Sequence, residues 1–367
     1  MIIFYVGIIL IIYSLIFKDK YSLNIAFSFI FLIMGFQSNV EGDYYSYFNE
    51  FSYLDLDGFI SSKEEYFWFY LVGISNKFIS FPTFICLLSL FQCFCVKKFI
   101  ARFADKKYLF ISAILFFFTF NYMLMQMKAL RQGLAVDMCM LSYVLIDNRN
   151  RKSLFTAILL SLAAYFTHKS SVICIFTVWG YCFFLNHVDL HSTDKRVKAF
   201  LKPQVLVLAL LLLYVSKKAF LDVYIIPAFS LLDDEHYMNY AIDFSEFAGQ
   251  MNLLPIIYDC IIIILLSWYI KYASYKEKYL VYIAILGIFI DVLVFATGSI
   301  QRLLLYFIFT HLAIFPGIAK QLSIRYGKVI TWMFLILLVG YAWKTSVFWL
   351  LSNKVDMFGQ YKFIFMN

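Results

Sequence analysis

The chain has 367 residues, of which 63% are hydrophobic and only 15% are charged. Soluble domains are about half apolar and about a quarter charged, so the composition excludes ordinary soluble and disordered proteins and indicates a polytopic membrane protein. The formal net charge of +8 does not indicate nucleic acid, because the cations flank apolar segments and form no single patch. We therefore expect one integral membrane domain over residues 1–367, surrounded by a lipid bilayer and without a nucleic acid partner.

Apolar segments recur along the whole chain. A transmembrane helix needs about 20 apolar residues, or somewhat fewer when its ends lie among the headgroups. By this criterion we predict an all-α polytopic fold with about twelve transmembrane helices. The apolar stretch 65–80 includes Asn76 and Lys77, so we expect it to lie along the membrane surface or to re-enter. The predicted spans are 2–17, 22–38, 82–96, 108–122, 131–146, 154–167, 171–185, 203–216, 253–270, 279–297, 303–319 and 330–350.

Alternate loops are rich in Lys and Arg, and this bias predicts the orientation of the chain. One set of loops holds 20 of the 31 Lys and Arg residues, and loops of this kind face the cytoplasm. Both termini then face outward, together with two longer loops over about 39–65 and 217–252. The cation-rich loops lie near residues 18–20, 97–107, 147–153, 187–202, 271–278 and 320–328.

Polar residues gather at the predicted outer ends of the spans. Three carboxylic acids, Asp137, Asp259 and Asp291, also lie six residues from those ends, about 9 Å deep. Buried carboxylates in a membrane usually face a wet cavity or a cation, so we expect a hydrophilic cavity open to the outside. The outer polar groups are Gly42-Asp43-Tyr44-Tyr45-Ser46-Tyr47 with Glu64-Glu65, Lys128 to Gly133, Thr167 to Ser171, and Ser299 to Arg302.

Each of these residues also has a structural interpretation. Arg131 and Arg302 would reach the headgroups as ordinary interface arginines. His168 is equally typical of a hydrogen-bonded histidine at the end of a span, and Asp137 of a residue that pairs with another helix for assembly. The tyrosines of the first outer loop fit an aromatic belt at the membrane surface.

The ordered set of motifs resembles the EpsG family, which belongs with the Wzy-type O-antigen and exopolysaccharide polymerases. The resemblance covers nearly the whole chain, although each motif is short. Glu65 corresponds to a family Glu, but Tyr66 follows where the family has Gly. The other matching residues are Asp43 and Tyr47 in Asp-x-x-x-Tyr, Arg131, Gln132 and Ala135 in the Arg-Gln element, His168 and Ser170 in His-x-Ser, and Arg302 and Tyr306 in the late Arg element.

This resemblance implies a metal-independent membrane glycosyltransferase with a GT-C-like multi-span architecture. Such an enzyme joins oligosaccharide repeat units carried on undecaprenyl pyrophosphate, at the outer leaflet of the bacterial inner membrane. Its products are O-antigen, exopolysaccharide or capsule, and its implied partners include a flippase and a chain-length regulator. We expect no cofactor and no metal site, since the chain has no C-x-x-C pair and Asp55-Leu56-Asp57 is typical of a solvated turn.

The implied reaction assigns roles to the matched residues. Arg131 and Arg302 suit the anionic pyrophosphate, because a guanidinium group stays charged and binds two oxygens at once. His168 is the candidate general base, since histidine exchanges protons near neutral pH. Asp43 and Glu65 are its rivals for that role. The residues expected to bind substrate are Gln132, Tyr44, Tyr47, Glu65, Ser170, Tyr240 and Tyr306.

Three other functions fit part of the same pattern. An O-antigen ligase, or a glycosyltransferase that uses polyprenyl-phosphate sugars, would need a similar site. A polysaccharide transporter or lipid flippase is the main alternative of another class, but the chain shows no inverted repeat and its polar residues lie near one face. A membrane acyltransferase would also use an intramembrane histidine. The resemblance favours the polymerase.

Overall fold

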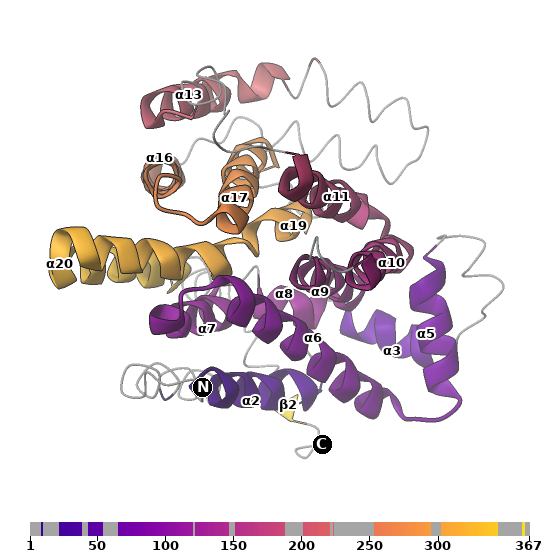
Figure 1. Ribbon diagram of the computed structural model, residues 1–367. Helices are drawn as coiled ribbons and strands as arrows, with labels where there is room; N and C mark the ends of the chain where they lie inside the picture. The colour runs from indigo at the N-terminus through magenta and orange to yellow at the C-terminus, as the bar shows by residue number, and fades with distance from the viewer. Residues whose placement is uncertain are drawn as a thin grey trace. The chain divides into compact units, whose positions relative to one another are not determined.

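The protein is described by a computed structural model (Figure 1). It describes residues 9, 22–38, 43–53, 65–119, 122–146, 151–187, 201–220, 223, 253–294, 302–343 and 362–363. Almost all of them are helical, and the strands among them are the two-residue β1 (Gln37–Ser38) and β2 (Lys362–Phe363), which pair antiparallel. The contacts divide the chain into two compact units: Met1–Asn186 with His311–Asn367, and His187–Thr310.

The first unit is built around α9. This helix packs against α6, α8 and α10, while α2 and α20 pack against α7 (Figure 1). Buried residues recur every three or four positions along α6, from Phe84 through Leu88 and Cys95 to Phe99, which is the spacing of one helix face. The helices of this unit are α2 (Ser22–Gly35), α3 (Tyr44–Ser52), α5 (Tyr66–Asn76), α6 (Phe81–Phe103), η1 (Lys106–Tyr108), α7 (Leu109–Phe118), α8 (Met123–Lys128), α9 (Leu130–Leu145), α10 (Arg151–Thr167), η2 (Lys169–Ser171), α11 (Val172–His187) and α20 (His311–Trp343).

The second unit is a smaller group of helices. It contains α13 (Pro203–Phe220), α16 (Leu253–Tyr269), α17 (Tyr275–Val294), η5 (Arg302–Leu304) and α19 (Leu305–Ile308). The first three contact one another, and η5 and α19 both pack on α17. Gly287 permits this packing, because a Cβ atom there would lie only 2.7 Å from Cβ of Phe307.

The helices confirm the predicted all-α fold, and their apolar composition is consistent with a membrane protein. Among the described residues, two helices are both long and apolar enough to cross a bilayer, Phe81–Phe103 and His311–Leu338. Shorter apolar helices coincide with five more of the predicted spans. The total of about twelve crossings stays a prediction, and the span at 2–17 lies outside the described part except for residue 9. Helix α5 has 11 residues, about 16 Å at 1.5 Å per residue, which is too short to cross.

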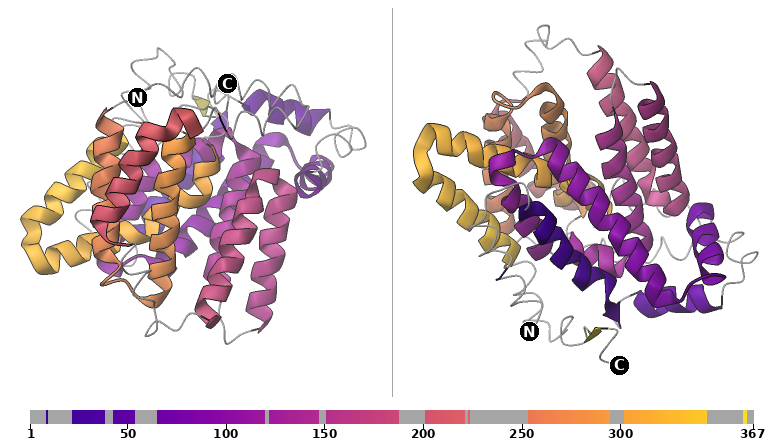
Figure 2. Two further views of the ribbon diagram at one scale, coloured as in Figure 1. Left: turned by 90° about the horizontal axis from the view of Figure 1, so that it is seen from above. Right: turned by 60° about the horizontal axis from the view of Figure 1, so that its bottom comes forward.

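The helices differ from the predicted spans and loops in four places. Helix α6 continues to Phe103, so much of the predicted loop 97–107 is helical. The predicted span 303–319 is divided, because α19 ends at Ile308 and α20 begins at His311. Most of the loop predicted at 320–328 is helical. The helical conformation is interrupted only at Gly327, whose φ of 84° turns the chain within α20 (Figure 2). The first outer loop also contains a helix, α3.

Candidate functional site

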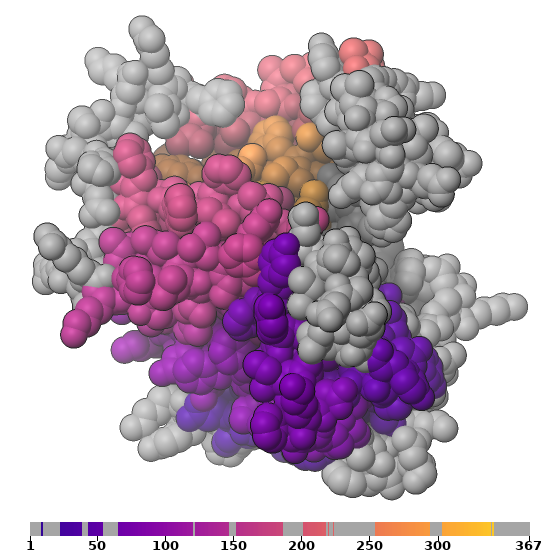
Figure 3. All heavy atoms as spheres, turned by 90° about the vertical axis from the view of Figure 1, so that its right-hand side faces the viewer, coloured from indigo at the N-terminus to yellow at the C-terminus, as the bar shows by residue number. Residues whose placement is uncertain are grey.

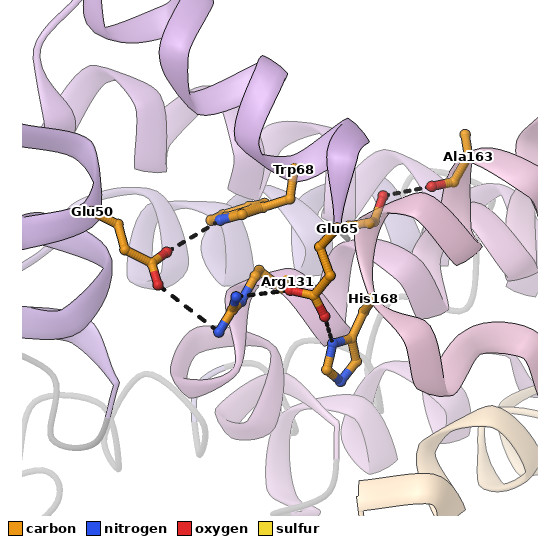
Figure 4. Close-up of polar contacts among 7 residues, drawn as sticks. Glu50, Glu65, Trp68, Arg131, Ala163 and His168 are labelled. Atoms are coloured by element: carbon orange, nitrogen blue, oxygen red, sulfur yellow. Dashed lines mark hydrogen bonds and ion pairs between the residues drawn. The ribbon is translucent and has the colours of Figure 1, made fainter. Parts of the chain in front are cut away.

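The carboxylate of Glu65 joins two other predicted site residues from distant parts of the first unit. Its Oε2 atom accepts a hydrogen bond of 2.8 Å from Nη1 of Arg131, and its Oε1 atom lies 2.6 Å from Nδ1 of His168 (Figure 4). Arg131 is 66 residues away in sequence and His168 is 103. Three of the predicted residues therefore form one cluster, which we call the Glu65 cluster, and its centre is Glu65.

The backbone brings the three side chains together at helix ends. Glu65 occupies the N-cap of α5, where its side chain makes no capping hydrogen bond and is used for Arg131 and His168 instead. Arg131 is in the first turn of α9. His168 follows the last residue of α10, and its amide donates to the carbonyl of Ala164 at 3.0 Å. Helix α5 packs on α10, and Figure 3 shows the side of the molecule on which both helices lie.

A second carboxylate, Glu50 of α3, lies behind Arg131. Its Oε1 atom is 4.0 Å from Nη2 of Arg131, and its Oε2 atom accepts a hydrogen bond of 3.3 Å from Nε1 of Trp68 (Figure 4). The guanidinium carbon also lies 5.5 Å from the centre of the Tyr47 ring, a cation–π distance. The Tyr47 ring in turn meets Trp68 edge-on at 5.6 Å. Arg131 is thus held by two carboxylates and one aromatic face.

The side chains of the Glu65 cluster and of Glu50 differ in how much they are exposed to solvent. The side chains of Glu50 and Glu65 are 5% and 8% exposed, that of Arg131 is 18% and that of His168 is 29%. Burial opposes the charge of Glu65, but the hydrogen bond from His168 and the charge of Arg131 outweigh it and lower the pKa of Glu65. Burial raises the pKa of Tyr47 in spite of the Arg131 charge. The imidazole of His168 is therefore more accessible to solvent than the carboxylate that it contacts.

Other predicted site residues of the first unit lie around the cluster. Asp43 is the N-cap residue of α3, and its carbonyl accepts from the amide of Tyr47 at 2.9 Å. Tyr44 packs against Phe81, with ring centres 5.4 Å apart. Gln132 is buried next to Arg131, and Ser170 is a half-buried residue of η2.

The late motif lies in the second unit. Tyr306 is fully buried in α19, and Arg302 begins η5. The side chain of Arg302 and all of Tyr240 lie outside the described residues. Whether Arg302 joins Arg131 in one pocket therefore stays a prediction.

Two residues of the site were missed by the sequence analysis, Glu50 and Trp68. The signal for Glu50 is its spacing, because Asp43, Tyr47 and Glu50 occupy positions i, i+4 and i+7 and so share a face when the segment is helical. That pattern was not recognised because the segment was treated as a loop. Trp68 is one of many aromatic residues, and nothing in the sequence distinguishes it.

The three membrane acids have different surroundings. Asp137 is fully buried in the first unit, where its Oδ1 atom accepts a hydrogen bond of 3.0 Å from Nε2 of Gln126. Asp259 belongs to the second unit and accepts a hydrogen bond of 2.7 Å from the hydroxyl of Tyr214. Lys217 and Asp291 of that unit interact electrostatically. The described part of the chain contains no group of three His, Cys, Asp or Glu residues that would hold a metal ion.

Comparison with known proteins gave one result. The model of the EpsG family matches residues 20–363, nearly the whole chain. No curated protein and no solved structure matches the chain.

Proposed function

The chain belongs to the EpsG family, and from this we propose that it is a polysaccharide polymerase. We infer that it joins oligosaccharide repeat units carried on undecaprenyl pyrophosphate, at the outer leaflet of the bacterial inner membrane. The observation that carries the proposal is the contact of Glu65 with both Arg131 and His168. A guanidinium group and an imidazole group within reach of one carboxylate provide an anion-binding group beside a proton acceptor.

In the proposed reaction, a hydroxyl oxygen of the acceptor sugar attacks the anomeric carbon of the donor glycan. The new glycosidic bond forms as the bond between that carbon and the pyrophosphate oxygen breaks. His168 takes the hydroxyl proton at Nε2, because Nδ1 faces Glu65. The departing undecaprenyl pyrophosphate keeps the electron pair, and fixed cations stabilise its growing negative charge.

Glu65 is a positioning residue in this scheme. It accepts a hydrogen bond from Nδ1–H, which fixes the orientation of the imidazole ring and directs Nε2 away from the carboxylate. This relationship supports His168 over Glu65 as the general base, because both carboxylate oxygens already have partners. Asp43 remains the other candidate.

The charges around Arg131 mean that it does not bind the pyrophosphate alone. Two carboxylates, Glu50 and Glu65, face this single guanidinium group. When both are ionised, the surroundings of Arg131 carry a net negative charge, and a pyrophosphate needs further cations. We propose that Arg302 supplies that charge. The N–H groups of Arg131 that Glu65 does not use would bind the phosphate oxygens.

The remaining predicted residues are proposed to contact the glycan. Three of them lie in the first unit within three residues of a residue of the site, since Tyr44 precedes Tyr47, Gln132 follows Arg131 and Ser170 follows His168. The full set is Tyr44, Tyr47, Gln132, Ser170, Tyr240 and Tyr306.

Deletion of the gene tests the proposal. The surface polysaccharide is analysed on gels, and the deletion is complemented with the wild-type gene or with the Arg131→Ala or His168→Ala variant. We expect the deletion to keep glycan of a single repeat unit and to lose the ladder of longer chains, with no rescue by either variant at normal protein level. Loss of the single-unit glycan as well would indicate a ligase or a transporter instead.

A further inference from the structure

The helical conformation is interrupted between α8 and α9, just before Arg131. Ala129 caps both helices with a non-helical φ of −105° and ψ of 69°. Its amide donates to the carbonyl of Met125, and its carbonyl accepts from the amide of Gly133, each at 2.8 Å. The position of Arg131 therefore depends on how the short helix α8 is held against α9.

A buried polar contact holds these two helices together. Nε2 of Gln126, in α8, donates to Oδ1 of Asp137, in α9, across 3.0 Å. Asp137 is completely buried, and Gln126 and Gln92 are nearly so. The side chain of Gln92, from α6, faces the same carboxyl group. Three helices thus meet at one carboxyl group, about 9 Å along α9 from Arg131.

Gly133 allows the close approach of the helices at this point. A Cβ atom there would lie 2.9 Å from Nε2 of Gln92 and 3.0 Å from Cα of Gln126. The second of these contacts is with backbone, so any side chain at position 133 would require α8 itself to move. Gly133, where α8 approaches α9 closely, lies between Arg131 and Asp137 in the sequence.

The hydrogen bond between Gln126 and Asp137 is costly to break because it is buried. Among the described residues, Oδ2 of Asp137, Oε1 of Gln126 and both polar side-chain atoms of Gln92 have no hydrogen-bond partner, so the bond from Gln126 to Asp137 is the hydrogen bond that these buried side chains share. Breaking the Gln126–Asp137 bond would leave a buried amide donor in an apolar interior, which costs more than the bond itself contributes. The contact therefore fixes α8 on α9 in one arrangement.

We propose that Asp137 is a positioning residue, which through Gln126 and Gln92 holds the α8–α9 junction so that Arg131 meets Glu65. The inference deepens the proposed function and, for the binding of pyrophosphate by Arg131, rests on it. It assigns Asp137 no contact with substrate. The sequence predicted a hydrophilic cavity at Asp137, but in the structure this residue is buried at the junction of the helices.

The first test measures the position of Arg131 without any substrate. The full-length protein in detergent is treated with phenylglyoxal, and the modification of Arg131 is followed by mass spectrometry. Asp137→Leu and Gly133→Ala should speed this reaction by about fivefold, because the guanidinium group loses its fixed contact with Glu65. Asp137→Asn should react as the wild type does, since its side-chain carbonyl oxygen still accepts from Nε2 of Gln126.

Ser142→Ala is the matched control on the same helix. Ser142 is buried in α9 and donates only to its own helix, to the carbonyl of Met138, so its loss should leave the labelling rate unchanged. Modification of Arg131 at the wild-type rate in both Asp137→Leu and Gly133→Ala would overturn the proposal. If Asp137→Leu gives no folded protein, Gly133→Ala carries the test with the addition of one methyl group.

The second test uses binding of farnesyl pyrophosphate, measured by calorimetry on the same preparations. Asp137→Leu should weaken binding by about fivefold, and Arg131→Lys should weaken it as well. The double variant should bind no more weakly than Arg131→Lys alone, because Asp137 acts through Arg131. Fully additive losses would contradict the proposal. If the wild type does not bind the probe, the assignment of Arg131 to pyrophosphate fails, while the labelling experiment still decides the role of Asp137.

Discussion

Nδ1 of His168 lies 2.6 Å from Oε1 of Glu65, although the two residues are 103 positions apart in the sequence. The other oxygen of the same carboxylate binds Arg131. Glu65 therefore couples the orientation of an imidazole ring to the position of a guanidinium group. A change at any one of the three residues should alter the other two, and the variants below separate their roles.

Arg131 should be needed for transfer of the glycan. Arg131→Ala removes the guanidinium group proposed to stabilise the leaving pyrophosphate, and we expect the rate of polymerisation to fall by about a hundredfold or more. Arg131→Lys should recover only part of this loss, because an ammonium group cannot bind two oxygens in a plane. Polymerisation by the purified protein measures the effect. Arg325→Ala, at an exposed position of α20, should retain full activity, and an equal loss there would contradict the assignment.

His168→Asn distinguishes catalysis from positioning. The Asn amide can still donate to Glu65 but cannot accept a proton near neutral pH, so we expect stability close to that of the wild type. The polymerisation rate should fall by between about a hundredfold and ten-thousandfold, the usual contribution of a general base. Thermal unfolding and chain-length analysis of the same preparation give the two measurements. Retention of long chains by His168→Asn would exclude His168 as the base and favour Asp43.

The stability of the protein should depend on Glu65 at acidic pH. The hydrogen bond from His168 and the charge of Arg131 outweigh the effect of burial, so the pKa of Glu65 lies below its ordinary value of 4.5. A lowered pKa stabilises the folded state in full above the unfolded value, and this contribution is lost as the pH falls through the lowered pKa. Thermal unfolding measured from neutral to acidic pH should show this loss. Glu65→Gln should be less stable at neutral pH and should lack this part of the pH dependence. A pH profile of stability identical to that of the wild type would contradict the role of Glu65.

Trp68→Phe tests whether the hydrogen bond from Trp68 to Glu50, a carboxylate next to Arg131, stabilises the protein. The substitution keeps the ring against Tyr47 but removes the N–H group that donates to Glu50 at 3.3 Å. A buried carboxylate oxygen then has no donor from Trp68, and we expect a loss of about 1–3 kcal/mol in the free energy of unfolding. Denaturation in detergent measures it. Glu50→Gln combined with Trp68→Phe should lose less than the sum of the single variants, whereas additive losses would show that the contact contributes little.

Gly327 should be essential to the turn within α20. Its φ of 84° and ψ of 178° lie in a region that is almost restricted to glycine, and a Cβ atom there meets nothing within 4 Å. Gly327→Ala should therefore destabilise the protein through the backbone alone, by about 1–3 kcal/mol. Gly340→Ala is the control, because that residue is helical and also has open space around it. The control should be neutral or slightly stabilising, and similar losses at both positions would contradict the explanation.

Much of the helical architecture follows from local sequence. The predicted spans at 131–146, 154–167 and 253–270 agree within about three residues with α9, α10 and α16, because apolar composition over a whole segment does not depend on distant contacts. Helix α3 was not predicted, since its alternating aromatic and polar residues match an irregular loop equally well. The break at Ile308 also escaped prediction, because residues on both sides of it are apolar.

The sequence by itself determined that this chain is a helical membrane protein of the EpsG family, and it identified Glu65, Arg131 and His168 as candidates. Composition and short ordered motifs are properties of the chain alone, so they can be read without coordinates. Only the tertiary structure decided that Glu65 lies between the other two, that Glu50 and Trp68 support Arg131, and that Asp137 is buried against Gln126. These contacts join residues from different helices, and their distances depend on how the helices pack, which no local pattern records.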